Sequence, residues 1–206
     1  MTLRYPESKT NMEGMASGPN PIEVYQGAAQ GLTPVFGAVN SGQLTSSTPC
    51  AEWNVKNLMN HNINVQTFLY SSLTGGSVTP GEMYQVDGDL PFQGAAAALK
   101  AITEQVIAAA DGMDFSTVMA TPFGEMPAGN FMMIPMLDMV VNHWDLASAI
   151  GHNNAIDAAL AEICLGVLSP EALEGGRQMD AFGPEVAIHT TGTVQERLLG
   201  PTGRAP

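Results

Sequence analysis

Apolar residues recur at three- and four-residue spacing in four long segments of this chain. These segments cover residues 21–40, 54–74, 91–110 and 131–150. The spacing predicts four amphipathic helices, because each apolar set falls on one helical face. Helices that each bury one face pack as a bundle, and the long connections 76–90 and 111–130 permit a crossover topology. The second connection contains TPFGEMPAGN, which is compatible with a hairpin.

Local signals indicate where the long helices begin and end. Asn54 is a good N-cap for the helix over 54–74, and Gly75 is a good stop. Pro135 fits best in the first turn of the helix predicted over 131–150, because a proline deeper inside removes a backbone donor. These signals agree with the apolar periodicity.

Two shorter helices are predicted after the bundle. The first covers 156–168 and is closed by Ser169-Pro170. The second covers 193–199, where Thr193 and Glu196 have the spacing of a capping box. We therefore expect extra C-terminal helices beside the four long ones.

The first 20 residues differ from the rest of the chain. Residues 1–20 are rich in Gly, Pro, Ser and Asn and lack an apolar signal core, so they predict a disordered tail. Either Met12 or Met15 could be the true translation start. Residues 21–206 have the length of one domain and show no internal boundary.

The charge balance excludes several classes of partner. The formal net charge is −13, with only seven Lys and Arg, so the surface repels nucleic acid and anionic lipid. No apolar run reaches the length of a membrane span. Cys50 and Cys164 do not make a disulfide framework, and they suggest reduced thiols in the cytoplasm. We expect a cytoplasmic protein with a small-molecule ligand.

The densest group of polar side chains lies between Asp138 and Ala147. Asp138 and Asn142 are four residues apart and share a helical face. His143 is five residues from Asp138, which places it roughly 140° around the helix. Two ligands four apart can hold one ion, and His143 is one position late for this arrangement. His61 lies beside the apolar stripe of 54–74 and is expected at or near the core.

Several motifs of the chain resemble one known family. Residues 48–61 read T-P-C-x-x-W-x-V-x-x-L-x-x-H. TPFGEMPAG then precedes D-x3-N-H-W-D-L-A-x-A-x-G, over residues 138–151. Together these segments resemble the DinB-like, mycothiol-dependent maleylpyruvate isomerase metal-binding domains. The tail AFGPEVAI…QERLLGPTGR is similar to the short, single-domain actinobacterial branch, so the resemblance spans about residues 21–204.

The resemblance implies an all-α, DinB-like four-helix bundle with up-down-down-up topology. It also implies a zinc or nickel ion between the second and fourth helices, which would bind a low-molecular-weight thiol such as mycothiol for isomerase or transferase chemistry. The family's His, carboxylate and His ligands correspond to His61, Asp138 and Asn142. Asn142 departs from the family pattern, where a second His is expected.

Three interpretations of Asn142 stay open. Its amide oxygen could be a weak ligand, a helix distortion could bring His143 inward instead, or the site could hold no metal. In the last case the protein would be a metal-free bundle that binds a small ligand or has a structural or interaction role. Whether the chain is an enzyme therefore stays open, and a homodimer is compatible with either hypothesis.

The same residues also have purely structural interpretations. His61 could be a hydrogen-bonded core histidine, and Asp138 could stabilise the start of its helix. Trp144 is expected in the core, and Asp145 is expected to accept a hydrogen bond from a neighbouring loop or indole. His143 is expected at a pocket rim or exposed.

The remaining histidines and one cysteine are less informative. His152 and His189 have no partner that spacing identifies, so both are expected at the surface. Cys50 could be a thiol near the site, because its loop precedes the helix over 54–74. A small buried hydrophobe is its structural alternative.

Overall fold

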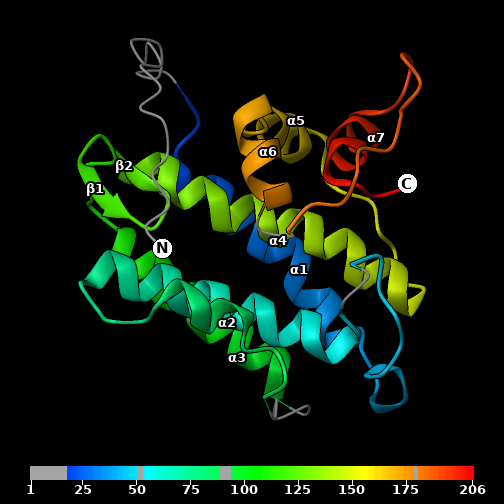
Figure 1. Ribbon diagram of the computed structural model, residues 1–206. Coiled ribbons are helices and arrows are strands. Elements are labelled where there is room, and N and C mark those ends of the chain that lie inside the picture. The colour runs from blue at the N-terminus through cyan, green and yellow to red at the C-terminus, as the bar shows by residue number, and fades with distance from the viewer. Residues whose placement is uncertain (1–17, 51–52, 89–93, 179–180) are drawn as a thin grey trace.

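The computed structural model describes residues 18–50, 53–88, 94–178 and 181–206 (Figure 1). The tail predicted over 1–20 lies outside these residues, except for its last three. Within the described residues the long helices are α1 (Pro21–Ala38), α2 (Val55–Thr74), α3 (Ala95–Ala110) and α4 (Ala128–Ile150). The shorter helices are α5 (Ala158–Val167), α6 (Pro170–Gln178) and α7 (Val194–Leu199). Three 3-10 turns and a hairpin complete the elements: η1 (Ser41–Gln43), η2 (Pro80–Tyr84), η4 (Gly200–Thr202), β1 (Val118–Thr121) and β2 (Gly124–Pro127).

The predicted helix ends of α2 and α7 are confirmed. The Asn54 side chain accepts from the Asn57 amide and begins α2, and Thr193 caps α7 together with Glu196. Gly75 ends α2 in the left-handed conformation, with φ of 73°. Each signal acts within four residues, so neighbouring residues are enough to specify it.

The four long helices form the predicted up-down-down-up bundle. Tyr25, near the start of α1, bonds to Gln66 in the C-terminal half of α2, so these helices are antiparallel. Phe68 packs on Phe131 while His61 meets Asp138, so α2 and α4 are also antiparallel. The described residues after α2 run back along it, because Asn64 donates to Gln85, Asn60 to Val86 and Asn57 to Asp87. The helix α3 therefore starts near the N-terminal end of α2 (Figure 1). The all-α fold class is confirmed.

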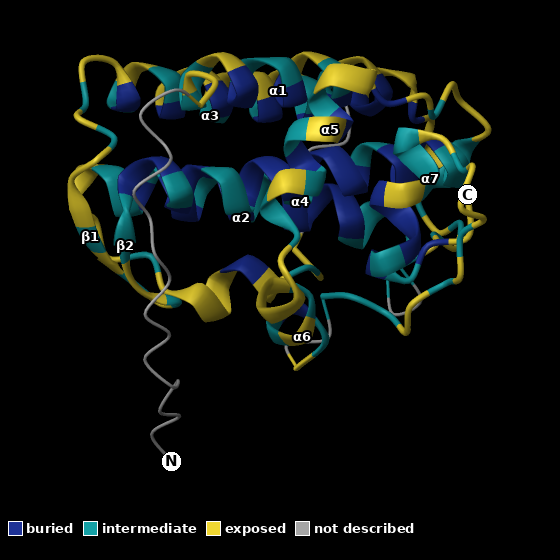
Figure 2. Cartoon of the chain, turned by 90° about the horizontal axis from the view of Figure 1, so that it is seen from above, coloured by how far each residue is buried: buried dark blue, intermediate teal, exposed yellow. Residues whose placement is uncertain are grey.

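Burial follows the predicted helical faces. Buried residues lie on the inner faces of the four long helices, whereas β1 and the outer faces are exposed (Figure 2). Met132, Met136 and Met139 of α4 belong to this core. They share it with the aliphatic and aromatic residues of α1. No described helix has both the length and the apolar character that a membrane span requires.

The start of α4 differs from the prediction. The hairpin of β1 and β2 is present, but β2 leads straight into α4 at Ala128, three residues before the predicted start. Pro135 therefore lies inside the helix and not in its first turn. Asp138 is also too far along α4 to stabilise the helix start, so that structural role for Asp138 is wrong.

The C-terminal region contains one helix that was not predicted. Ser169-Pro170 ends α5, as expected, but Pro170 also begins α6. A proline at the first helical position costs no hydrogen bond, and its fixed φ already suits a helix. The following segment, from 181 to 206, carries α7 and η4 and returns to α4 through Arg204, which bonds to Asp145.

Candidate functional site

His61 is held between two acceptors in the bundle interior. It lies on α2 and is only 5% exposed. Its Nδ1 is 3.0 Å from the Met83 carbonyl oxygen of η2, and its Nε2 is 3.4 Å from Asp138 Oδ1 of α4. Because the carbonyl can only accept, Nδ1 carries a proton and donates to Met83. Nε2 is thereby directed at Asp138.

Two aromatic rings surround His61. The Trp53 ring centroid is 4.4 Å from that of His61, and the Tyr84 centroid is 5.6 Å away. The Thr48 hydroxyl donates to the Trp53 carbonyl at 2.8 Å and so helps to fold the loop before α2 onto the site. Trp53 belongs to the motif noted in the sequence, whereas nothing in the sequence pointed to Tyr84.

Burial and Asp138 act in opposite directions on the pKa of His61. Burial lowers the pKa of His61, but the charge of Asp138, its hydrogen bond and the Met83 carbonyl raise it, and the net pKa is above the ordinary value. Burial and the same carboxylate raise the pKa of Tyr84, which therefore stays neutral. Without a metal, Asp138 thus favours the protonated form of His61.

Asn142 lies on the same face of α4 as Asp138. It is 3% exposed, and its Nδ2 has no hydrogen-bond partner in the described protein. The Oδ2 of Asp138 is likewise buried without a partner, although the side chain as a whole is 31% exposed. Unsatisfied buried polar atoms are costly, which makes them candidates to bind an ion or a small ligand.

Asp145 extends this polar face of α4, because it is two helical turns beyond Asp138. It is fully buried and bonds to Arg204, with Nη2 at 2.8 Å and Nε at 3.2 and 3.3 Å. The predicted acceptor role of Asp145 is confirmed, and its donor comes from the C-terminal segment. Burial lowers the pKa of Arg204, but Asp145, with smaller effects from Cys50 and Asp138, raises it above the ordinary value.

His143 is not brought to His61. All residues of α4 are α-helical, without the distortion that would turn His143 inward. Its Nδ1 lies 3.5 Å from the point where Gly31 of α1 would carry a Cβ. Burial lowers the pKa of His143, the Asn153 carbonyl opposes this, and His152 lowers it further.

Within the described residues, no group of three or more His, Cys, Asp or Glu could hold a metal ion.

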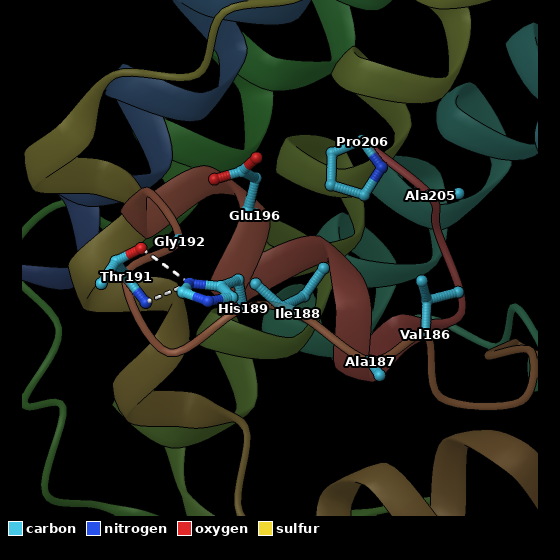
Figure 3. Close-up of a pocket in the computed structure, with 9 residues that line it drawn as sticks. All are labelled: Val186, Ala187, Ile188, His189, Thr191, Gly192, Glu196, Ala205 and Pro206. Carbon is cyan, nitrogen blue, oxygen red and sulfur yellow. Dashed lines mark hydrogen bonds between the residues drawn. The ribbon is translucent and has the colours of Figure 1, made fainter.

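A separate hollow of about 450 Å³ lies on the C-terminal segment (Figure 3). Its lining residues are Val186, Ala187, Ile188, His189, Thr191, Gly192, Glu196, Ala205 and Pro206. Its main polar groups already bond within the segment, since Glu196 accepts from Thr193 and His189 accepts from Thr191. The buried, unsatisfied polar atoms lie on α2 and α4 instead, so we place the candidate site at His61.

Comparison with known proteins identifies related sequences. The model of the mycothiol maleylpyruvate isomerase N-terminal domain family matches residues 26–147. An uncharacterised protein of Mycobacterium tuberculosis strain CDC 1551 is 29% identical over 144 residues, which cover 69% of this chain and 74% of the relative. An uncharacterised protein of strain H37Rv matches with the same values. No solved structure matches the chain significantly.

Proposed function

The chain belongs to the mycothiol maleylpyruvate isomerase N-terminal domain family, and on this premise we propose that it binds one divalent metal ion between α2 and α4. His61 and Asp138 would hold the ion, and Asn142 would complete the protein ligands. The bound ion would in turn hold a small molecule, with a low-molecular-weight thiol as the first candidate. The reaction class is isomerase or transferase chemistry on a small electrophile.

The orientation of His61 carries this proposal. Its Nδ1 donates to the Met83 carbonyl, which leaves Nε2 for an ion. Metal-binding histidines usually have such a partner on the second ring nitrogen, because it sets the tautomer and the ring orientation. The buried, unpartnered Oδ2 of Asp138 adds a negative ligand beside this nitrogen.

Asn142 determines which ion fits. An amide and a carboxylate offer oxygen, and a single imidazole offers nitrogen, so the set suits hard ions better than zinc. The unpartnered atom of Asn142 is assigned as nitrogen, and a half-turn of the amide places its oxygen there instead. The residues therefore fit a weakly held ion such as Mn²⁺ better than a tight zinc site.

The chemistry expected of the site concerns the thiol. A bound cation stabilises the thiolate over the thiol at neutral pH. The role of His61, Asp138 and Asn142 would be to position the ion, while Trp53 and Tyr84 shield the His61 ring from water. The Arg204–Asp145 pair would keep the C-terminal segment against the same face of α4.

A second candidate function is a metal-free protein that binds a small ligand or a partner. The raised pKa of His61 favours it, because a proton on Nε2 competes with a metal ion for that nitrogen. Asn142 in place of a histidine favours it as well. In this case the His61–Asp138 ion pair itself would be the polar element of the pocket.

Metal titration of the untagged, chelator-treated protein tests the two candidates. Mn²⁺ should broaden the NMR resonances of the His61 ring, and Asp138→Asn should abolish this effect. Asn142→His should bind Zn²⁺ at least about tenfold more tightly than the wild type, because imidazole is a better ligand for zinc than an amide. His189→Ala, at an exposed histidine, is the control and should change neither result. If added metal leaves the His61 resonances unchanged in both the wild type and Asn142→His, the metal-binding proposal is wrong and the metal-free function remains.

A further inference from the structure

Residues 80–88, which include η2, lie along α2 without much apolar packing. All of these residues are described, and only Met83 among them is buried. Their backbone hydrogen bonds include local ones, in which the Gln85 amide donates to Glu82 and the Val86 amide to Tyr84. Contacts with side chains of α2 are therefore needed to hold this segment against the helix.

Three asparagines on one face of α2 provide these contacts. Asn57, Asn60 and Asn64 are three and four positions apart, so they share a helical face. Asn60 makes the shortest bonds, because its Nδ2 donates to the Val86 carbonyl at 2.7 Å and to the Gly88 carbonyl at 2.8 Å. Asn57 and Asn64 donate to the same segment at 3.1 Å. Both donor hydrogens of the buried Asn60 amide are thus used.

The segment that Asn60 holds also carries the acceptor of His61. Met83 is three residues before Val86, and its carbonyl oxygen is 3.0 Å from His61 Nδ1. Asn60 and His61 are neighbours on α2 and point about 100° apart around the helix, so one segment can contact both. Loss of the Asn60 bonds would therefore free the Met83 carbonyl to move away from the ring.

Two acceptors compete for the single ring proton of neutral His61. The Met83 carbonyl faces Nδ1 at 3.0 Å, and Asp138 Oδ1 faces Nε2 at 3.4 Å. The hydrogen bond made by one ring nitrogen determines which nitrogen carries the proton. With the Met83 carbonyl in place, the proton stays on Nδ1 and Nε2 keeps its lone pair. Without it, the proton moves to Nε2 and is donated to Asp138, so Nε2 can no longer bind an ion.

We propose that Asn60 is a positioning residue for His61, which acts through residues 80–88 by keeping the Met83 carbonyl on Nδ1. Asn60 itself is directed at the Val86 and Gly88 carbonyls and not at the interior site. Partners that orient a metal-binding histidine typically change metal affinity about 10- to 100-fold. This consequence for metal affinity rests on the proposed function, whereas the effect of Asn60 on the ring proton does not.

NMR of the ring nitrogens of His61 in the full chain tests this role. Spectra are recorded without metal, at a pH where the ring is neutral, and the wild type should carry its proton on Nδ1. Asn60→Asp keeps the size of the side chain but directs a carboxylate at two carbonyl oxygens, which repels the segment. The proton should then move to Nε2. Asn60→Ala removes both bonds without repulsion and should give a mixture of the two tautomers, and circular dichroism checks that each variant folds.

Asn64→Ala is the matched control, because Asn64 lies on the same face and makes a single, solvent-exposed bond to Gln85. It should leave the proton on Nδ1. A wild-type proton on Nε2, an unchanged tautomer in Asn60→Ala, or an equal change in Asn64→Ala would overturn the proposal.

The affinity for Mn²⁺ is measured separately on the same variants. It should fall at least about tenfold in Asn60→Ala and stay unchanged in Asn64→Ala. A wild type that binds no metal would contradict the proposed function, but the tautomer spectra would still decide the role of Asn60. A changed tautomer with unchanged Mn²⁺ affinity would likewise count against the proposed ion at Nε2 and not against the positioning role.

Discussion

Arg204 and Asp145 form a buried ion pair that fastens the C-terminal segment to α4. The Asp145 side chain is fully buried and that of Arg204 is 6% exposed. Arg204 also donates to the Thr202 carbonyl at 2.8 Å, so the guanidinium is well satisfied. A buried pair with this many bonds is costly to break from one side, because the remaining charge is left without a partner.

Arg204→Met should lower the free energy of unfolding by about 3–5 kcal/mol, because it leaves the Asp145 carboxylate buried and unpaired. Urea unfolding measures the change. Arg197→Ala is the control: Arg197 pairs with Glu162 at 2.9 Å on the surface, and its loss should cost less than about 1 kcal/mol. Arg204→Met with Asp145→Leu should recover much of the stability, since no charge is then left buried. A double variant as unstable as the single one would contradict this explanation.

Tyr25 and Gln66 form a buried hydrogen bond between α1 and α2. The Tyr25 hydroxyl donates to Gln66 Oε1 at 2.7 Å, and both residues are fully buried. Tyr25→Phe should cost about 1–3 kcal/mol, because it leaves the Gln66 oxygen without a donor. Adding Gln66→Leu should cost less than the sum of the two single changes. Additive costs in this double-mutant cycle would show that the bond does not couple the two helices.

Cys164 makes stability depend on pH in the alkaline range. Burial raises its pKa from 9.0 to about 12. Below pH 9 the thiol is neutral in both states and has no effect. Between pH 9 and 12 the unfolded chain loses the proton and the folded chain keeps it, so this group lowers stability by about 1.4 kcal/mol per pH unit. Unfolding in urea at pH 8 to 11 should show a shallower decline for Cys164→Ala, and identical declines would rule out this origin.

Gly203 allows two backbone segments to come close together. Its φ is 88°, and an added Cβ would lie 2.6 Å from the Gly183 Cα. Gly203→Ala should therefore destabilise the protein by about 1–3 kcal/mol. Gly175→Ala is the control, since it lies in α6 with nothing within 4 Å of an added Cβ, and it should be neutral or stabilising by up to about 1 kcal/mol. Thermal unfolding distinguishes the two, and equal effects would count against a backbone clash.

Much of the fold could be predicted from local patterns. The four long helices follow from apolar spacing, and the caps at Asn54 and Thr193 follow from residues within one turn. The start of α4 could not be placed, because β2 leads directly into it and its first amides, those of Ala128 and Gly129, donate to the Thr117 and Phe115 carbonyls before β1. A similar limit applied to α6, since Pro170 can end one helix and begin another.

The candidate site was predictable only in part. His61 and Asp138 are brought together as expected, and Asn142 shares the face of Asp138. The Met83 carbonyl, Tyr84 and Arg204 could not be assigned, because no periodicity connects them to α2 or α4. The place of His143 was also undecided, since a regular helix turns it away from Asp138 but a local distortion would turn it inward.

The amino-acid order alone specified the helices, their caps and the polar face of α4, because each depends on residues at most a few positions apart. The partners of that face were decided by the tertiary structure. His61 and Asp138 are 77 residues apart, and Asp145 and Arg204 are 59 residues apart. Such contacts form only when helix packing brings distant segments together. The same packing turned His143 toward Gly31 of α1.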